Sequence, residues 1–354
     1  MMRSGHVKRT NPRPALVCLI MALIFISGVQ AADTYSFVTA WGTKGTGNGQ
    51  FTMPNIVAVD PSGNVYATDL ISNRIQKFNP DGQFISSIGS GGRADGQFMG
   101  VEGIAFDPSG NMYVTDLNNN RVQKFSPAGS FLATWGTYGK GNGQLGSPNG
   151  VGVDAYGNSY VADSLNNRIV KFGPTGVYVT SWGSPGNGEG QFTGPNGVVT
   201  DSAGNIYVSD LYRVQKFNPD GKFLASFGAP GSGEGQLNDP CGVAVDIAGN
   251  LYVADKFNNR IVKFGPAGSV VAVWGALGNA TGQFDLPMGV AVDNSGNVYV
   301  ADSMNNRIQK FSSSSAPAPA GAKGPSASKS PMSLLSVLGA LGAIPAGFVI
   351  VGKR

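Results

Sequence analysis

Residues 148–172 read PNGVGVDAYGNSYVADSLNNRIVKF, and this pattern of short apolar runs separated by turn residues decides the fold. The pattern recurs six times along the chain, and each copy carries an aspartate after its second apolar run. These aspartates lie 47 residues apart, except for 45 between the fourth and the fifth, and they are Asp69, Asp116, Asp163, Asp210, Asp255 and Asp302. A repeat of this length with four strand-like runs is typical of propeller blades. The sequence therefore predicts an all-β fold, a six-bladed β-propeller.

The strands of each copy are predicted from their β-branched and aromatic residues and from the turns between them. In the first copy the predicted strands are 57–60, 65–68, 74–78 and 84–88. The sixth copy stops after its third strand, at Phe311, whereas an unpaired strand of the fourth type, 37–41, precedes the first copy. We expect this N-terminal strand to complete the last blade with the C-terminal strands, because closure removes open sheet edges.

Three recurring runs also resemble a known family. They are Gly-Val-Ala-Val-Asp, Gly-Asn-x-Tyr-Val-x-Asp and Asn-Asn-Arg-Ile-x-Lys-Phe, the last as found at 166–172. These runs resemble NHL repeats, and the resemblance covers residues 37–311. It implies a six-bladed propeller that serves as an interaction platform, as in sensor domains tethered outside bacterial cells. The enzymatic branch of that family, the amidating lyases, depends on metal-binding histidines, and the only histidine here is His6.

The N-terminus predicts export. Four basic residues precede an uncharged run at 15–29, which leads into a small-x-small pattern that ends at Ala31. We therefore expect residues 1–31 to be a cleaved signal peptide and 32–36 to be a short lead into the propeller. The alternative is an uncleaved N-terminal anchor, since the run is only slightly short for a membrane span.

The C-terminus predicts a membrane anchor. Residues 312–330 are rich in Ser, Pro and Ala and are expected to form a flexible linker. Residues 331–354 are expected to form a C-terminal transmembrane helix, because 332–352 carry no charge and a basic end follows. Basic residues stay on the cytoplasmic side of a membrane, so the propeller is expected at the cell surface.

Composition excludes several classes of function. Between Phe37 and Phe311 there are 17 Lys and Arg residues against 20 Asp and Glu residues, so the propeller lacks the basic footprint of a nucleic-acid-binding protein. His6 and Cys18 both lie in the predicted signal peptide. The mature chain would then have no imidazole for a Ser-His-Asp triad or a zinc site, and we predict no catalytic residues.

The six copies act as internal controls, since a residue that every copy keeps is expected to belong to the scaffold. The two aspartates and the arginine of each copy are interpreted in this way, as loop-ordering hydrogen bonds and ion pairs. One position at the start of the first strand varies instead, and its six residues are Asn55, Glu102, Asn149, Asn196, Cys241 and Met288. The first strand of a blade is innermost, so these six are predicted to ring the mouth of the central channel.

We predict that this ring binds a ligand. Asn55, Glu102, Asn149 and Asn196 offer oxygens that suit a divalent metal such as Ca²⁺. The competing interpretation is a water-filled channel with no bound cofactor. The starts of two strands, at 148–150 and 195–197, also resemble those of gluconolactonase-type hydrolases, which hold a divalent metal with Glu, Asn and Asp. That resemblance implies a metal-dependent hydrolase as the alternative function, although the ring contains no Asp.

The fourth copy has a shorter loop, with Leu-Tyr between Asp210 and Arg213 where most copies have four residues. This loop is predicted to leave a notch beside Tyr212, where an exposed aromatic ring would favour ligand binding. Taken together, the residues predict a non-enzymatic cell-surface platform. Its expected partner is a protein, glycan or envelope ligand on the loop-bearing face, and its expected contact with the membrane is the C-terminal helix.

Overall fold

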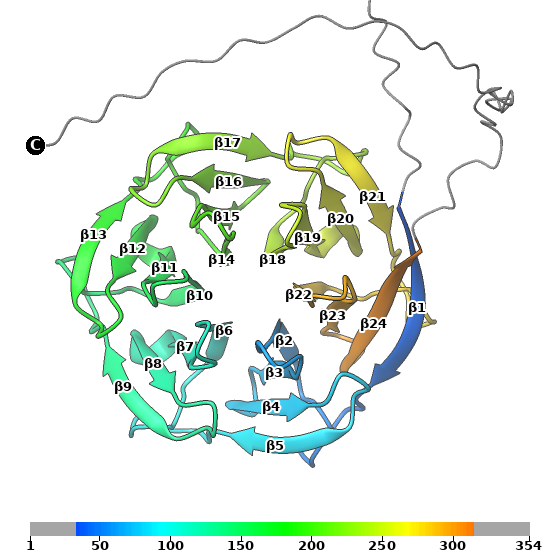
Figure 1. Cartoon of the computed structure of the whole chain (residues 1–354), viewed down its shortest axis with the longest axis horizontal. Coiled ribbons are helices and arrows are strands. Elements are labelled where there is room, and N and C mark those ends of the chain that lie inside the picture. Colours follow the sequence, from blue (N-terminus) through cyan, green and yellow to red (C-terminus); the bar gives the residue numbers. More distant parts are fainter. Residues whose placement is uncertain (1–32, 315–354) are drawn as a thin grey trace, which may run out of the picture. The chain divides into compact units, whose positions relative to one another are not determined.

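Six four-stranded antiparallel sheets surround a central channel in the computed structural model, which describes residues 33–314 (Figure 1). The all-β, six-bladed propeller predicted from the repeat is confirmed. In each blade the first strand lies at the channel and the fourth at the outer edge. Blade one consists of β2 (Pro54–Val59), β3 (Val65–Asp69), β4 (Arg74–Phe78) and β5 (Phe84–Ile88).

Blades two to five repeat this order, and their strand bounds follow the sequence repeat. They are β6 (Val101–Phe106), β7 (Met112–Asp116), β8 (Arg121–Phe125), β9 (Phe131–Trp135); β10 (Pro148–Val153), β11 (Ser159–Asp163), β12 (Arg168–Phe172), β13 (Tyr178–Trp182); β14 (Val198–Thr200), β15 (Ile206–Asp210), β16 (Arg213–Phe217), β17 (Phe223–Phe227); β18 (Pro240–Val245), β19 (Leu251–Asp255), β20 (Arg260–Phe264) and β21 (Val270–Trp274). Blade six has the order β1-β24-β23-β22, with β1 (Thr34–Trp41), β22 (Pro287–Val292), β23 (Val298–Asp302) and β24 (Arg307–Ser314).

The turn between the first two strands of a blade explains the repeated Asp and Gly-Asn. Asp60 Oδ1 accepts hydrogen bonds from the backbone N–H groups of Ser62 (2.9 Å) and Asn64 (2.8 Å). Gly63 between them has φ +87°, a left-handed conformation that glycine adopts without a steric cost. The same bonds recur in the other five blades, around Asp107, Asp154, Asp201, Asp246 and Asp293.

The second aspartate and the arginine of each repeat fasten two loops together, as blade three illustrates. Asp163 is fully buried, accepts a hydrogen bond from the Gly146 N–H (2.6 Å) and pairs with Arg168 Nε (2.6 Å). The Arg168 guanidinium also donates to the carbonyl oxygens of Lys140 (2.9 Å) and Gln144 (2.9 Å). The prediction that these repeated charges are scaffold is confirmed by these contacts.

Buried aromatic and β-branched side chains fill the spaces between neighbouring blades. Tyr113 of blade two, for example, packs in one cluster with Val161 and Phe172 of blade three. Trp135 at the end of β9 lies over Gly176 in the next blade, where an added Cβ would come within 2.8 Å of the indole ring. Each blade is therefore stabilised by its neighbour, and the ring must close for every blade to have two partners.

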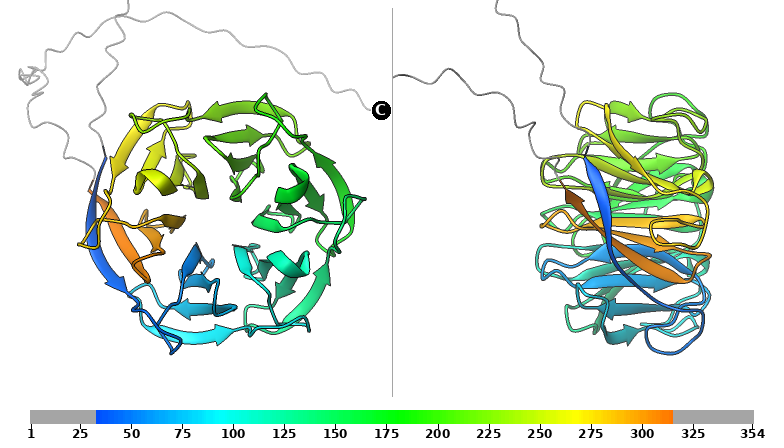
Figure 2. Two further views of the ribbon diagram at one scale, coloured as in Figure 1. Left: turned by 180° about the vertical axis from the view of Figure 1, so that it is seen from behind. Right: turned by 90° about the vertical axis from the view of Figure 1, so that its right-hand side faces the viewer.

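Closure by the N-terminal strand is confirmed. β1 pairs antiparallel with β24 from Thr34 opposite Ser314 to Trp41 opposite Ile308, and the two ends of the propeller lie side by side (Figure 2). The Trp41 ring packs against Phe78 of blade one and Tyr299 of blade six.

The predicted bounds of this closing pair, 37–41 and 311, are each three residues short. The extension is held by side chains, because Tyr35 stacks on Trp274 with ring centroids 4.1 Å apart and Lys263 Nζ pairs with Asp33 Oδ2 at 2.7 Å. Residues 34–36 and 312–314, predicted as lead and linker, therefore belong to the sheet.

The remaining predicted segments lie outside the described residues. These are the signal peptide 1–31 and, from residue 315 onward, the linker and the C-terminal anchor. Between residues 33 and 314 the structure contains three short 3-10 helices, η1 (Leu117–Asn119), η2 (Ser164–Asn166) and η3 (Lys256–Asn258). Within this range no helix has the length and apolar character needed to cross a membrane.

Candidate functional site

Two sets of loops meet on one face of the propeller, which we call the loop face. One set joins the fourth strand of a blade to the first strand of the next, and the other joins the second and third strands within a blade. The arginine bridges described above connect the two sets. The six predicted ring residues lie at or just before the start of the innermost strands, at the edge of this face: Asn55, Glu102, Asn149, Asn196, Cys241 and Met288.

Neighbouring members of the ring contact each other in two pairs. Asn55 Nδ2 donates a hydrogen bond to Glu102 Oε2, and Asn196 Nδ2 contacts Cys241 Sγ at 3.3 Å. Asn55 and Cys241 are each only 2% exposed. Among the described residues, the side chains of Asn149 and Met288 have no hydrogen-bond partner. All six ring residues are thus buried or half-buried, and four of them are engaged with a neighbour in the ring.

Burial changes the acidity of two ring residues. Loss of hydration raises the pKa of Glu102 from 4.5 to about 7, although the Asn55 hydrogen bond and the charge of Lys256 act in the opposite direction. Burial also raises the pKa of the Cys241 thiol to about 12, with a further contribution from Asp239. A thiol of this kind stays protonated at neutral pH and is a poor nucleophile.

Blade five contributes an ion pair beside the ring. Lys256 Nζ, at the start of η3, lies 2.7 Å from Asp239 Oδ2 in the loop before β18. This pair was not predicted from the sequence, because only one position was compared across the blades. Asp239 lies two positions before the ring residue Cys241, and Lys256 is the first residue of the loop between the second and third strands. A comparison of these two positions across the blades would have identified the pair. The other five blades have uncharged residues where Lys256 lies: Leu70, Leu117, Ser164, Leu211 and Ser303.

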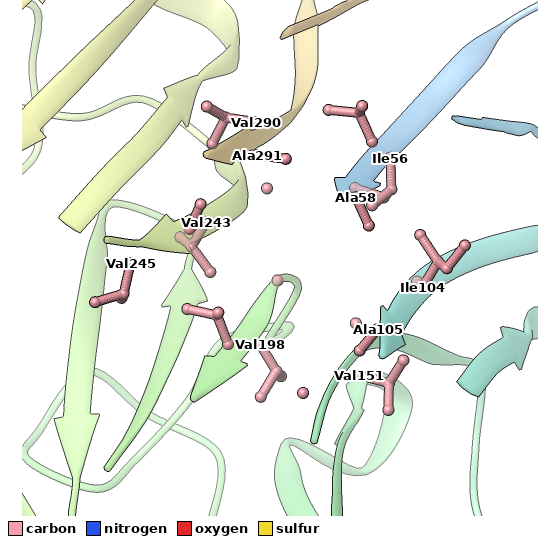
Figure 3. Close-up of a pocket in the computed structure, with 18 of the residues that line it drawn as sticks. Ile56, Ala58, Ile104, Ala105, Val151, Val198, Val243, Val245, Val290 and Ala291 are labelled. Atoms are coloured by element: carbon pink, nitrogen blue, oxygen red, sulfur yellow. The ribbon is translucent and has the colours of Figure 1, made fainter. Parts of the chain in front are cut away.

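Aliphatic side chains line the wall of the channel. Beyond the ring, a cavity of about 230 Å³ is lined by the innermost strands of all six blades, with aliphatic side chains such as Ile56, Val151, Val198 and Val243 (Figure 3). This lining does not test whether water fills the channel, so the interpretation of a water-filled channel stays a prediction.

The ring donors do not suit a hard divalent cation. Ca²⁺ takes six to eight oxygen ligands, usually with several carboxylates. Glu102 is the one carboxylate of the ring, and Asn55 already bonds it, while Cys241 and Met288 in blades five and six offer sulfur. Within residues 33–314 no group of three or more His, Cys, Asp or Glu side chains is close enough together to hold a metal ion.

Exposed apolar side chains surround the ring on the loop face. They occupy one position, the second residue of the loop between the second and third strands, in five of the six blades. These residues are Ile71, Leu165, Tyr212, Phe257 and Met304, which we call the apolar rim. Blade two has Asn118 at this position. Only Tyr212 of these residues was predicted from the sequence, because the exposure of a side chain cannot be read from its residue type.

Tyr212 lies in the two-residue turn between β15 and β16 and is 39% exposed. The loop of blade four is shorter than its counterparts, as predicted, and the Leu211 carbonyl before Tyr212 accepts a hydrogen bond from the Asp239 N–H (2.9 Å) of blade five. The shortened loop is therefore fastened to its neighbour, and Tyr212 takes its place in the apolar rim.

The outer loops of the loop face carry charges of opposite sign on its two sides. Lys44 and Lys140 are exposed in the loops that lead into blades one and three, whereas the loop into blade two exposes both Arg93 and Asp95. Glu189 and Glu234 are exposed in the loops that lead into blades four and five. A partner that covers the whole face would meet both signs, which favours one orientation over the others.

Two family models match the chain. The NHL repeat matches residues 284–311, and the SMP-30/gluconolactonase/LRE-like region matches residues 104–234. The chain is a six-bladed propeller that contains an NHL repeat. The second match covers the blades that contain Asn149 and Asn196 but begins after Glu102. No curated protein matches the sequence.

Solved structures with the same fold have diverse descriptions. An auxiliary nutrient binding protein from Bacteroides thetaiotaomicron is 14% identical, with a TM-score of 0.59 over 79% of this chain and 72% of that one. A gluconolactonase from Xanthomonas campestris is 14% identical, with a TM-score of 0.56 over 81% and 99%. Virginiamycin B lyase from Staphylococcus aureus is 14% identical, with a TM-score of 0.54 over 79% and 98%. At these identities the likeness establishes the propeller fold alone.

Proposed function

We propose that this NHL-repeat propeller is a non-enzymatic platform that binds a protein partner on its loop face. The observation that carries the proposal is the apolar rim, five exposed apolar side chains at one loop position around the channel mouth. Single exposed apolar residues are ordinary, but a group of them on one face is typical of interaction sites. The aromatic members, Tyr212 and Phe257, are residue types that dominate binding energy at interfaces.

Three further observations support a binding role over catalysis. The polar ring residues are engaged with one another, as in the pair formed by Asn55 and Glu102. The Cys241 thiol is buried and its raised pKa makes it unreactive. Proteins described as auxiliary nutrient binding proteins share the fold. A glycan or another envelope ligand could contact the same face, but the apolar rim favours a protein.

The test is a pull-down with residues 32–315, followed by affinity measurements on any captured protein. Tyr212→Ala and Phe257→Ala are each expected to weaken binding by at least tenfold, because they remove aromatic contacts from the loop face. Tyr156→Ala and Ile247→Ala are the matched controls, since both side chains are highly exposed in turns between first and second strands, away from the rim. If the control variants lose binding and the rim variants keep it, the loop face is not the interface.

We further propose that the platform is displayed outside the cell and held by its C-terminal segment. The support is sequence alone: the basic and apolar pattern of residues 1–31 and the uncharged stretch 332–352 followed by Lys353-Arg354. Protease added to intact cells should digest the propeller, and a protected propeller would contradict this location.

A second candidate function is metal-dependent hydrolysis of a lactone. The match of residues 104–234 to the SMP-30/gluconolactonase/LRE-like region favours it. The ring counts against it, because Glu102 is its one carboxylate and two of its other side chains offer sulfur. Hydrolysis of a panel of sugar lactones in the presence of Ca²⁺, abolished by Glu102→Gln, would establish this candidate in place of the platform.

A further inference from the structure

The junction between blades one and two differs from the other five junctions around the channel. In five blades the residue after the ring position is glycine, and an added Cβ there would lie less than 3.0 Å from the backbone of the next blade: Gly103, Gly150, Gly197, Gly242 and Gly289. Blade one has Ile56 at this position. Since Ile56 carries a branched side chain, β2 cannot approach β6 as closely as the other innermost strands approach their neighbours.

A second difference concerns the three blades that carry a hydroxyl before the second aspartate, since blades three, five and six have Ala162, Ala254 and Ala301 there. The Thr115 hydroxyl of blade two donates to the Asn149 carbonyl of blade three, and the Ser209 hydroxyl of blade four donates to the Cys241 carbonyl of blade five (2.6 Å). All three hydroxyls accept a hydrogen bond from an N–H of their own blade. The Thr68 hydroxyl of blade one differs in its donation, which goes to the Ile56 carbonyl (3.4 Å) of its own blade. No such bond therefore crosses from Thr68 to blade two.

A groove of about 580 Å³ opens at this junction on the loop face. Its walls come from loops of the two adjacent blades in Figure 1 and include the apolar side chains of Leu70, Ile71, Met99 and Leu117. Glu102 is the one charged residue among those that line it. The blade-two gap in the apolar rim, at Asn118, also lies along this groove.

The negative charge of Glu102 has no cationic partner of its own. Its hydrogen-bond partner is the neutral amide of Asn55. Lys256, whose charge reaches Glu102 from blade five, is itself bonded to Asp239 at 2.7 Å. A partly buried carboxylate without a counter-ion is costly, and a cation that enters the groove would relieve that cost.

We propose that this groove binds an aliphatic primary ammonium group, the chemistry of a lysine side chain, with Glu102 as its counter-ion. The ammonium group would pair with the Glu102 carboxylate, while the methylene stem lies against the apolar walls, as lysine stems do on apolar surfaces. This inference deepens the proposed function, because it assigns the lysine to the protein partner on the loop face.

The test uses small probes and the full chain in mild detergent, so it does not depend on the partner. Binding of Nα-acetyl-lysine amide is measured at pH 8 and low salt by ligand-observed NMR, with Nα-acetyl-norleucine amide as the uncharged control. We expect the lysine derivative to bind at least tenfold more tightly. Glu102→Gln should remove this preference, and Glu189→Gln, which neutralises an exposed carboxylate in an outer loop, should leave it unchanged.

A second variant tests the groove without touching the carboxylate. Asn118 is exposed at the groove, so Asn118→Trp should fill it and weaken lysine-amide binding at least fivefold while the melting temperature stays unchanged. Equal binding of the two amides, or full binding by Glu102→Gln, would overturn the proposal. Binding of n-butylammonium but not of the lysine derivative would overturn the assignment to a protein lysine. Failure of these probes would leave the test of the apolar rim, with Tyr212→Ala and Phe257→Ala, unaffected.

Discussion

Glu102 makes the stability of the propeller depend on pH in a direction that a single substitution can test. Its pKa lies near 7 in the folded protein, against 4.5 for an ordinary glutamate, because burial disfavours the carboxylate. Each tenfold change in proton affinity corresponds to about 1.4 kcal/mol, so the difference amounts to about 3 kcal/mol. Replacement by glutamine removes the titration but keeps the size and polarity of the side chain.

The direction follows from which state binds the proton more tightly. Below pH 4.5 the carboxyl group is protonated in both states and costs nothing. As the pH rises from about 4.5 to 7, the unfolded chain has already lost the proton while the folded protein keeps it, so the free energy of unfolding falls. Above the folded pKa the loss is complete. Wild-type stability should therefore decrease from pH 4.5 to pH 8 relative to Glu102→Gln.

The assay is urea unfolding of the wild type and of Glu102→Gln at pH 4.5 and at pH 8, with Glu189→Gln as an exposed control. We expect the difference in unfolding free energy between wild type and Glu102→Gln to change by about 3 kcal/mol between the two pH values, in favour of the variant at pH 8. The control should track the wild type. A difference that does not change with pH would show that Glu102 is solvated and would refute the account of the ring.

Three other perturbations test the fold and the ring. Deletion of 32–43 should lower the melting temperature far more than deletion of 316–354, because the first removes β1 from blade six while the second begins beyond β24; equal melting temperatures would contradict closure. Gly150→Ala should destabilise the protein by about 1–3 kcal/mol, because its Cβ would collide with the Asn196 carbonyl. Gly173→Ala, whose nearest neighbour would be 3.7 Å away, should be close to neutral, so a smaller cost for Gly150→Ala than for Gly173→Ala would be evidence against tight junctions. Addition of Ca²⁺ should leave the melting temperature unchanged; a rise that chelator reverses and Glu102→Gln abolishes would instead establish a cation site.

The sequence was sufficient for the fold because its signals are local and repeated. Six aspartates at near-constant spacing define the blades, and the unpaired strand before the first blade can pair only with the last. The ends of that pair were misplaced by three residues because Ser312–Ser314 belong to a polar tract that lacks a strand pattern. What holds this extension is the contact between Tyr35 and Trp274, which are 239 positions apart and come together only after closure.

The candidate site was predictable only in part. Comparison of the six copies identified the ring and Glu102, because one acidic residue among amides and sulfurs is visible in the sequence. The raised pKa of Glu102 and the groove beside it depend on burial and on the separation caused by Ile56, which no local pattern reports. The apolar rim was missed for a related reason, since residues such as Leu165 and Phe257 are read as core unless their exposure is known.

The most direct test of the central claim is amide hydrogen exchange of the propeller with and without a captured protein partner. The account predicts slower exchange in the loops of the loop face that carry the apolar rim, including 70–73, 164–167 and 256–259. Exchange in the opposite turns, such as 60–64 and 154–158, should stay the same. Protection of those turns with unchanged exchange in the rim loops would contradict the loop face as the binding surface.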